Sequence, residues 1–393
     1  MTSAEATGAR LPWDAENPYE FYAARRREGN VVWDEAAQAW LVLSYDAARE
    51  VLGGTGWTSD PFANALALAS ADAVTREFSR GSMLFADGAE HQRLRGSVRD
   101  VFTRNFVADL GTGVQSVADD LICHSAKGRE FDFMADIALP LPVAVISAWL
   151  DLDAAAAHLL REVSPVIIRM LGTLAEPDEM IAGTTASAML MAAFLPIAAD
   201  RRAHPGDDLF SFIAGDPDLA LEEVVMTAIL IAVAGHETTA NLLGAAMDTL
   251  LTPDADGARI ADRIDPADPA VAAELIRLDA PVQSTVRTAT ADHVLDGVKI
   301  AAGQSTLVAI AAANRDPAVF DEPDRFRLDR GGPAPLSFGY GAHYCLGAAL
   351  AQLELAIALP RILARRPVLV GQVSWRDTPA IRGPVSVPMT FGD

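Results

Sequence analysis

Cysteine is scarce in this sequence, which has only Cys123 and Cys345 among its 393 residues. Neither cysteine belongs to a CxxC or CxxxxC pair, and this argues against a zinc site or an iron–sulfur cluster. Two unpaired cysteines also fit a reducing compartment. Cys123 lies in an ordinary helical context, where a buried free thiol is the usual outcome. Any special chemistry of sulfur is therefore expected at Cys345.

Positive charge and long hydrophobic runs are lacking as well. The formal net charge of −22 argues against nucleic acid and anionic membrane surfaces as partners. The longest uncharged apolar run, Val224 to Gly235, is too short to span a bilayer. No signal peptide is visible, because Met1 to Trp13 has neither a basic start nor an apolar run. We therefore expect a cytoplasmic, soluble monomer without a membrane or nucleic-acid partner.

Internal repeats, linkers and low-complexity segments are not found either. Half of the residues, 51%, are hydrophobic, which predicts a large core. No boundary suggests two domains, so we expect a single domain over residues 1–393. Most of the chain has helical patterns, whereas Val31–Trp33 and Trp40–Leu43 predict a β-hairpin and Thr288–Val308 has short extended runs. The expected fold class is mainly α with a small β portion.

The longest predicted helix occupies the middle of the chain. It is expected to start near Pro217, with Asp216 as its N-cap, and to end at about Leu251. Two other long helices are predicted to be kinked or split by Pro165 and Pro196, because proline removes a hydrogen bond inside a helix.

The most informative stretch is the decapeptide Phe338–Gly347, FGYGAHYCLG, which precedes a helical pattern. Its first two glycines allow unusual backbone angles and a close approach to a flat ligand. Cys345 stands where this loop enters the helix, and free N–H groups and the helix dipole there stabilise an anionic sulfur. A thiolate in this setting, shielded from water by Phe338, can serve as the axial ligand of haem iron.

A second unusual stretch, Ala234–Thr239 (AGHETT), lies inside the longest helix. Its glycine and two threonines each oppose helix formation by roughly 0.5–1 kcal/mol, as is expected at functional sites. Ala234 and Gly235 would let a flat ligand lie against the helix, and Glu237 and Thr238 offer groups for proton delivery. On its own the hexapeptide is better explained by a kink between packed helices. A metalloprotease HExxH site is excluded because residue 240 is alanine.

The pattern F-G-x-G-x-H-x-C-x-G at Phe338–Gly347 resembles the haem-binding loop of the bacterial cytochrome P450 family. The resemblance covers nearly the whole chain, with five motifs in the order of the family. It implies the single-domain cytochrome P450 fold, with haem b between the long central helix and the cysteine-loop helix. Cys345 is then the iron ligand, Thr238 a hydrogen-bond donor to the bound oxygen, and Glu237 a proton relay.

The same resemblance implies further contacts with the haem. H-x-x-x-R at His91 and Arg95, R-x-A-x-x-D beginning at Arg287, and His343 of the loop would bind the two propionates. Each of these residues alone is better explained as a solvated surface charge. The complete set of implied haem contacts is His91, Arg95, Ala234, Gly235, Arg287, Phe338, Gly339, His343, Cys345 and Gly347.

Glu274-Leu275-Ile276-Arg277 places opposite charges three residues apart on a predicted helix. An exposed pair of this kind is common and contributes only about 0.2–0.5 kcal/mol. The resemblance, together with Pro323-Asp324-Arg325-Phe326, implies instead a network of Glu274, Arg277 and Arg325. This network would support the cysteine loop from behind and have a structural role.

The resemblance also implies the reaction, a monooxygenation that uses O2 and two electrons to insert one oxygen atom into a C–H bond or an alkene. The electrons are expected from a separate ferredoxin and ferredoxin reductase, since the chain contains no flavin or iron–sulfur module. Arg93 is the predicted contact for the ferredoxin. Two alternatives stay open at this point, a peroxide-driven haem-thiolate oxidase and a non-catalytic haem sensor.

The sequence does not identify the substrate. We expect a small lipophilic molecule, in bacterial secondary metabolism, because the predicted pocket walls are mainly apolar. Those predicted walls are Met83, Leu84, Phe85, Leu230, Ala234, Val282, Thr285 and Val385.

Overall fold

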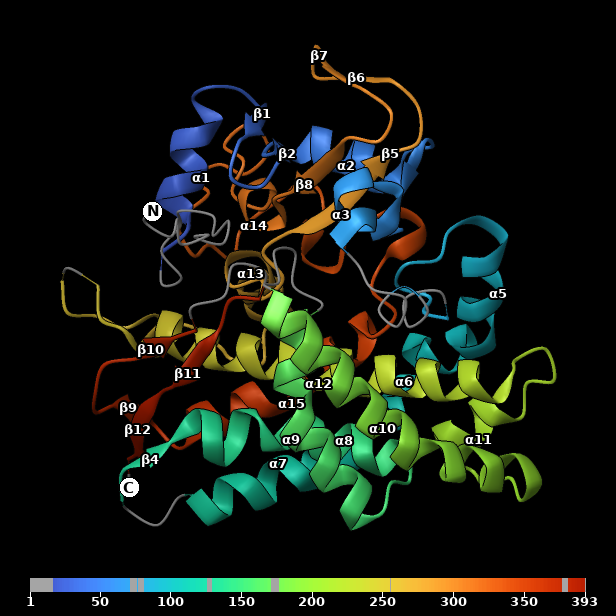
Figure 1. Cartoon of the computed structure of the whole chain (residues 1–393). Coiled ribbons are helices and arrows are strands. Elements are labelled where there is room, and N and C mark those ends of the chain that lie inside the picture. Colours follow the sequence, from blue (N-terminus) through green and yellow to red (C-terminus); the bar gives the residue numbers. More distant parts are fainter. Residues whose placement is uncertain are drawn as a thin grey trace, which may run out of the picture.

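The structure is a computed structural model that describes residues 17–70, 76, 81–125, 129–170, 177–254, 256–376 and 381–392. Helices dominate these residues, and the short strands form one sheet of five strands, one of three and two of two. Figure 1 shows the five-stranded sheet with α2 and α3 at the top and most long helices below it. The C-terminal strands lie at the lower left, next to β4.

The α-helices of the described chain are α1 (Tyr19–Arg26), α2 (Tyr45–Gly53), α3 (Ala65–Ser70), α5 (Gly88–Arg99), α6 (Arg104–Ala108), α7 (Gly111–Ser125), α8 (Pro140–Trp149), α9 (Ala154–Met170), α10 (Pro177–Ala203), α11 (Leu209–Ala214), α12 (Leu221–Leu251), α13 (Pro269–Leu278), α14 (Ile310–Ala313) and α15 (Ala348–Ala364). The strands are β1 (Val31–Asp34), β2 (Ala39–Val42), β3 (Trp57–Thr58), β4 (Phe131–Asp132), β5 (Thr285–Ala289), β6 (His293–Leu295), β7 (Val298–Ile300), β8 (Ser305–Val308), β9 (Pro367–Leu369), β10 (Ser374–Trp375), β11 (Pro384–Ser386) and β12 (Pro388–Phe391).

Helix α12 is the centre of the helical part. It packs against α8, α9, α10 and α15, and most of its 31 residues are buried. The predicted start near Pro217 is wrong, because the helix begins at Leu221. The Asp216 carboxylate accepts the Asp218 N–H at 2.9 Å in a local turn, and Glu223 accepts the Ala220 N–H at 2.8 Å. Glu223, inside the first turn, therefore satisfies the N–H of the N-cap residue Ala220, which is the reverse half of a capping box.

The large sheet has the strand order β1-β2-β8-β5-β3. The predicted hairpin is confirmed, with Val31 opposite Val42 in an antiparallel pair. Strand β8 runs parallel to β2 and antiparallel to β5. This arrangement brings Thr285 and Arg287, both on β5, into the interior of the molecule from a part of the chain far from α12.

Pro165 and Pro196 lie inside α9 and α10, and neither proline splits its helix. These two helices pack against each other and against α12. Tertiary packing thus outweighs the lost hydrogen bond at each proline.

Two helical segments, Asp178–Ala203 and Leu221–Leu251, are long and apolar enough to cross a membrane by length and composition alone. The second of these is α12, whose apolar window is 72% buried inside the protein. A helix that is apolar on all sides is expected in the core of a large domain. Its hydropathy is therefore explained by its central position.

A carboxyl group is buried where α15 packs against α12. Glu354 is 1% exposed, and neither of its oxygens has a partner with good hydrogen-bond geometry among the described residues. Burial raises the pKa of Glu354 from 4.5 to about 8, and the Thr239 hydroxyl that faces the carboxyl counters this only in part. The folded protein therefore keeps a proton here at neutral pH.

We expect Glu354→Gln to stabilise the fold at neutral pH and to flatten its pH dependence. Between pH 4.5 and about 8 the folded state binds more protons at Glu354 than the unfolded state, so stability falls as pH rises through this window. The neutral amide removes this loss, which amounts to at most about 3 kcal/mol at pH 7. Denaturant unfolding across this pH range measures the effect.

The exposed Glu222→Gln variant on α12 is the matched control, and its pH dependence should follow the parent. If the free energy of unfolding depends on pH equally in the Glu354→Gln variant and the parent, Glu354 is ionised in the folded protein.

Candidate active site

The predicted cysteine loop lies between two short 3-10 turns and the start of α15. The Cys345 N–H donates to the Phe338 carbonyl at 2.7 Å, which closes the loop, and Gly347 is the N-cap of α15. Gly341 has φ +76°, and a Cβ built there would lie 2.7 Å from the Leu52 carbonyl oxygen. Glycine is therefore required at this position by both backbone angle and space. The predicted setting of Cys345 at a loop-to-helix junction is confirmed.

Cys345 is surrounded by protein but accessible on one side. Burial raises the pKa of its thiol, while the backbone N–H groups of Gly347 and Ala348 and the Arg95 guanidinium favour the thiolate. These donors do not outweigh burial, so a bound cation is needed to keep the sulfur ionised at neutral pH. An exposed cysteine at a loop-to-helix junction, with backbone N–H groups that favour its thiolate, fits the thiolate ligand of an iron atom.

The four predicted propionate ligands converge beside the loop. The rings of His91 and His343 lie 4.2 Å apart. Arg287 is close enough to lower the pKa of both histidines, and Arg95 is close enough to lower that of His91. Burial, followed by the charges of Arg287 and His91, lowers the pKa of His343 to about 4. Asp87 is the carboxylate in contact with this group, with Oδ1 3.2 Å from Nε2 of His343. A buried site with two arginines and one carboxylate suits a ligand that brings carboxylates of its own.

Both arginines already have partners in the protein. Arg95 donates from Nη2 to the Tyr344 carbonyl at 2.6 Å, so it also holds the residue next to Cys345. Arg287 donates from Nη1 to the Val286 carbonyl at 2.7 Å and to the Thr285 hydroxyl at 3.2 Å. A guanidinium has five N–H donors, so both side chains keep donors for a ligand.

Between Val224 and Met247 the accessible side chains of α12 are confined to one stripe. Ala234 is exposed and Leu230, Gly235 and Thr238 are partly exposed, although residues 231–233 and 239–247 are buried. The nearest atom to a Cβ built on Gly235 is 3.9 Å away, on Ile146, so protein packing does not require glycine there. Small residues on an accessible stripe of a core helix fit a flat group lying against it.

The predicted acid and alcohol of this helix do not bond to each other. The Thr238 hydroxyl donates to the Ala234 carbonyl at 3.0 Å. Glu237 is 1% exposed, and its Oε2 lies 3.1 Å from Nη2 of Arg376. Arg376 was missed by sequence reasoning. It lies about 140 positions after Glu237, and no local pattern indicated the contact.

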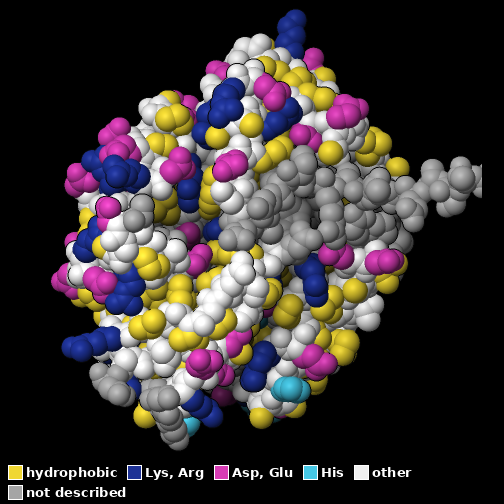
Figure 2. All heavy atoms as spheres, turned by 90° about the vertical axis from the view of Figure 1, so that its left-hand side faces the viewer, with side chains coloured by type: hydrophobic (Ala, Val, Ile, Leu, Met, Phe, Trp, Pro, Cys, Tyr) yellow, Lys and Arg dark blue, Asp and Glu magenta, His cyan; other side chains and the backbone are white. Residues whose placement is uncertain are grey.

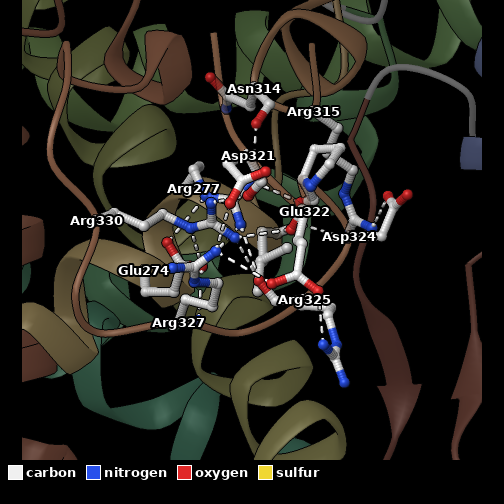
Figure 3. A network of polar contacts seen from close by, with 12 residues as sticks. Glu274, Arg277, Asn314, Arg315, Asp321, Glu322, Asp324, Arg325, Arg327 and Arg330 are labelled. Carbon is white, nitrogen blue, oxygen red and sulfur yellow. Dashed lines mark hydrogen bonds and ion pairs between the residues drawn. The ribbon is translucent and has the colours of Figure 1, made fainter. Parts of the chain in front are cut away.

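The Glu274–Arg277 pair is buried, which confirms that it is not a surface pair. Arg277 donates to Glu274 through both Nε, at 2.9 Å, and Nη2, at 2.7 Å (Figure 3). The third member of the network is Arg330 and not the predicted Arg325. Nε of Arg330 donates to Glu274 at 2.7 Å, whereas the Arg325 guanidinium is 74% exposed and pairs with Glu322. Arg325 takes part through its carbonyl, which accepts from Arg277 and Arg330.

Asn314 links this network to the cysteine loop. Its carbonyl accepts from Nη1 of Arg277 at 2.9 Å, and its side chain bonds the Leu336 N–H at 2.7 Å and the Ser337 hydroxyl at 2.8 Å. Ser337 in turn donates to the Ile276 carbonyl of α13 at 2.6 Å. Sequence reasoning assigned Asn314 no role, although NRDP at residues 314–317 was a visible signal. The ion pair is therefore connected to the loop through one fully buried asparagine.

The predicted pocket walls come together only in part. A bridge between Val282 and Ile381 joins the segment before β5 to the C-terminal hairpin, where Val385 is 51% exposed. Met83 is buried, whereas Leu84 is 39% exposed and Phe85 partly exposed. No contact given by the described residues joins Met83–Phe85 to Val282, Thr285 or Val385. Residues 71–75, 77–80 and 171 of the segments expected to shape the pocket lie outside the described residues.

Arg93 is not available to a ferredoxin as predicted. Its guanidinium bonds both Glu90, one turn earlier on α5, and Glu223 of α12, as well as the Asp218 carbonyl. The two carboxylates neutralise it, and Glu223 comes from a helix whose position the sequence does not give. Arg104 is a better candidate for the ferredoxin contact, because it is exposed and lies close enough to Tyr344 to affect the pKa of that residue.

Comparisons with known proteins identify the family. The family model "Cytochrome P450" matches residues 268–377. The chain is 34% identical to the cytochrome P450 monooxygenase PikC of Streptomyces venezuelae, with 96% of this chain and 92% of the relative covered. It is also 34% identical to the nocardicin C N-oxygenase of Nocardia uniformis subsp. tsuyamanensis, over 90% and 89% of the two chains.

Solved structures give the same result for the fold. P450BioI, in complex with an acyl carrier protein ligated to hexadec-9Z-enoic acid, matches with a TM-score of 0.88 at 27% identity, over 96% of this chain and 99% of that one. CYP164A2 of Mycobacterium smegmatis matches with a TM-score of 0.85 at 30% identity, over 96% of each chain. The fold and the site thus define a haem-thiolate oxygenase. The chain belongs to the cytochrome P450 family and is a P450 monooxygenase.

We expect Arg277→Ala to give little haem-loaded protein. Removal of one partner leaves the buried Glu274 carboxylate with fewer donors, at a cost of about 3–5 kcal/mol, and breaks the link through Asn314 to the cysteine loop. Haem content per polypeptide and denaturant unfolding measure the two effects. The exposed Arg325→Ala variant is the matched control and should retain both values. Parental haem content and stability in the Arg277→Ala variant would contradict the structural role.

Proposed function

We propose that this protein inserts one oxygen atom from O2 into a small lipophilic molecule, by hydroxylation or epoxidation, in bacterial secondary metabolism. The observation that carries the proposal is the position of Cys345 on an accessible wall, with backbone N–H groups on its sulfur and Arg95, His91, Arg287 and His343 beside it. The proposal treats residues 1–393 as one domain.

The proposed haem site has three parts. Cys345 is the single protein ligand to iron of haem b, and Phe338, Gly339 and Gly347 shape the loop around the sulfur. His91, Arg95, Arg287 and His343 hold the propionates. Ala234 and Gly235 form the flat surface on α12. When bound, the haem supplies the oxygen chemistry, which a thiolate ligand promotes by donating electron density.

Proton delivery is proposed for Thr238 and Glu237. The Thr238 Oγ is on the accessible stripe of α12, so its hydroxyl can present a proton to the reaction site once it leaves the Ala234 carbonyl. Glu237 is one residue earlier on the same helix and would return a proton to Thr238 from solvent. The protein thereby controls when protons reach the haem.

An apolar substrate is favoured by the walls near α12. Leu230 and Ala234 are accessible without charge, and Val282 and Val385 add aliphatic side chains from two other segments. Relatives named for lipophilic substrates include a steroid C26-monooxygenase of Mycolicibacterium smegmatis and a vitamin D(3) 25-hydroxylase of Pseudonocardia autotrophica. A screen of lipophilic compounds for substrate-induced changes in the haem spectrum tests this class.

The expected test of the iron ligand is Cys345→His. We expect this variant to lose the thiolate-type Soret band in the reduced carbon-monoxide spectrum, because imidazole cannot donate charge as a thiolate does. Cys123→Ser is the control and should keep the band, because Cys123 lies on α7 with no role in the site. The expectation that Cys123 is buried is wrong, since its side chain is exposed on that helix. Retention of the band in the Cys345→His variant would disprove the assignment.

Turnover with different oxidants tests the reaction itself. Product formed with NAD(P)H, ferredoxin and ferredoxin reductase supports the proposal. Product formed with hydrogen peroxide alone would indicate the peroxide-driven alternative, and absence of product under both conditions would indicate a haem sensor.

Electrons are proposed to arrive from a ferredoxin on the side of the cysteine loop. Acidic and basic side chains are interspersed on the face in Figure 2, which is the left-hand side of Figure 1. Arg104 is exposed beside Tyr344, and no carboxylate pairs with it among the described residues. An acidic ferredoxin can approach a local cation of this kind despite the net charge.

We expect Arg104→Glu to lower the rate of reduction by ferredoxin and to weaken its dependence on salt, because charges at the rim of an interface act mainly on association. The haem spectrum and substrate affinity should stay unchanged. Stopped-flow reduction across a salt series measures the rate. Lys299→Glu reverses a charge on the β6–β7 hairpin at the top of Figure 1 and is the control. Equal rates for the Arg104→Glu variant and the parent would place docking elsewhere.

A further inference from the structure

The partner of Glu237 is the feature of this site that the proposed chemistry does not use. Glu237 Oε2 and Arg376 Nη2 are 3.1 Å apart, and the Glu237 side chain is 1% exposed and that of Arg376 17%. A carboxylate this deeply buried is unfavourable unless a cation accompanies it. Arg376 is therefore placed to set the direction in which the carboxylate proposed to relay protons points.

His236 does not take this role. Its Nδ1 lies 2.8 Å from the Ala232 carbonyl, which can only accept, so Nδ1 carries the proton. Burial lowers the pKa of His236, and the neutral ring then presents a lone pair at Nε2, 3.9 Å from Glu237 Oε1. Among the residues that the structure describes, the side chains facing Glu237 are thus a neutral histidine on its own helix and one arginine.

Arg376 comes from the β10–β11 hairpin, which is held tightly against α12. The Arg376 N–H donates to the Gly383 carbonyl at 3.0 Å. A Cβ built on Gly383 would lie 2.2 Å from Asn241 of α12, and one built on Gly244 would lie 2.6 Å from Pro384. The hairpin can therefore hardly move over α12 without changing the position of Arg376.

The same hairpin carries a predicted wall of the substrate pocket. Val385 follows Pro384 on β11 and is 51% exposed, and the bridge from Ile381 to Val282 ties the hairpin to a second wall residue. One short element thus connects the acid of α12 to the place where substrate is expected.

We propose that Arg376 is a positioning residue that holds the Glu237 carboxylate toward the β10–β11 hairpin and away from Thr238, so that substrate against the hairpin controls proton delivery. This inference rests on the proposed roles of Glu237 and Thr238. When Glu237 leaves Arg376 it accepts a proton from a hydronium ion of the solvent, which becomes water, and passes it to the Thr238 hydroxyl. Thr238 gives its own proton to an oxygen atom of O2 as that molecule is reduced. Glu237 ends the cycle as the carboxylate that Arg376 binds again, and no electrons pass through Glu237 or Thr238.

The test compares Arg376→Gln, Arg376→Lys and Glu237→Gln in the haem-loaded enzyme. Infrared difference spectra, assigned with the Glu237→Gln variant, follow protonation of the carboxyl without turnover. We expect Arg376→Gln to shift this titration upward by about one pH unit or more, because the buried carboxylate loses its cation. Arg376→Lys should return the titration most of the way to that of the parent. Bound substrate should shift the titration of the parent but not that of the Arg376→Gln variant.

Product formed per NAD(P)H consumed gives the functional readout. Arg376→Gln should lower this ratio when it is introduced into the parent. It should not lower the ratio further when it is added to Glu237→Gln, because Arg376 acts through Glu237. Arg382→Gln is the control on the same hairpin, where Arg382 lies 3.8 Å from Asp279 and stacks on Trp375. It should leave both the titration and the ratio near those of the parent.

Three outcomes would overturn the inference. These are an unshifted titration in the Arg376→Gln variant, an equal loss in the Glu237→Gln background, and an equal loss in the Arg382→Gln variant, which would indicate general disruption of the hairpin. The proposed relay fails separately, if Glu237→Gln alone leaves the product ratio and the solvent isotope effect unchanged. In that case a shifted titration would show an ion pair without a role in proton delivery.

Discussion

The buried ion pair between Glu274 and Arg277 is the constraint on which the rest of the site depends. A guanidinium 2% exposed is tolerated only if nearly every donor has a partner, and Arg277 satisfies this with Glu274 and the carbonyls of Asn314, Pro323 and Arg325. The chain after β8 must therefore wrap around one side chain of α13. The position of the cysteine loop follows from that path, because the Asn314 side chain bonds Leu336 and Ser337 immediately before the loop.

Helix α12 meets two opposing requirements. It has to fill the core against α8, α9, α10 and α15, which calls for a helix that is apolar all round, and it has to keep one stripe accessible to ligand. Ala234 and Gly235 keep this stripe flat, at a cost in helix propensity that the buried remainder offsets. The acid beside the stripe is then so deeply buried that it needs Arg376, and this ties α12 to the C-terminal hairpin.

Sequence reasoning predicted the parts of the site that depend on local pattern. The loop before Cys345 and the small residues on α12 are arranged as expected, because glycine angles and helix spacing are local properties. The grouping of His91 with Arg287 and His343 followed from the family resemblance and not from local pattern. It failed where the partner is set by the path of the backbone. Arg325 and Arg330 are five residues apart and chemically identical, and only the turn around Glu322 decides which guanidinium points inward. The same holds for Arg376.

The haem site has to supply positive charge although the chain as a whole is strongly negative. A thiolate and two propionates would bring three negative charges into a protein whose net charge is already −22. Burial keeps His91 and His343 largely neutral, so Arg95 and Arg287 with the iron must balance them. Asp87 adds one more negative charge, held at low pKa by hydrogen bonds from Thr58, Ser59 and His343 although burial opposes this. It accepts the Nε2–H of the neutral His343 ring at 3.2 Å and so fixes that ring, and a neutral imidazole does not repel the two arginines.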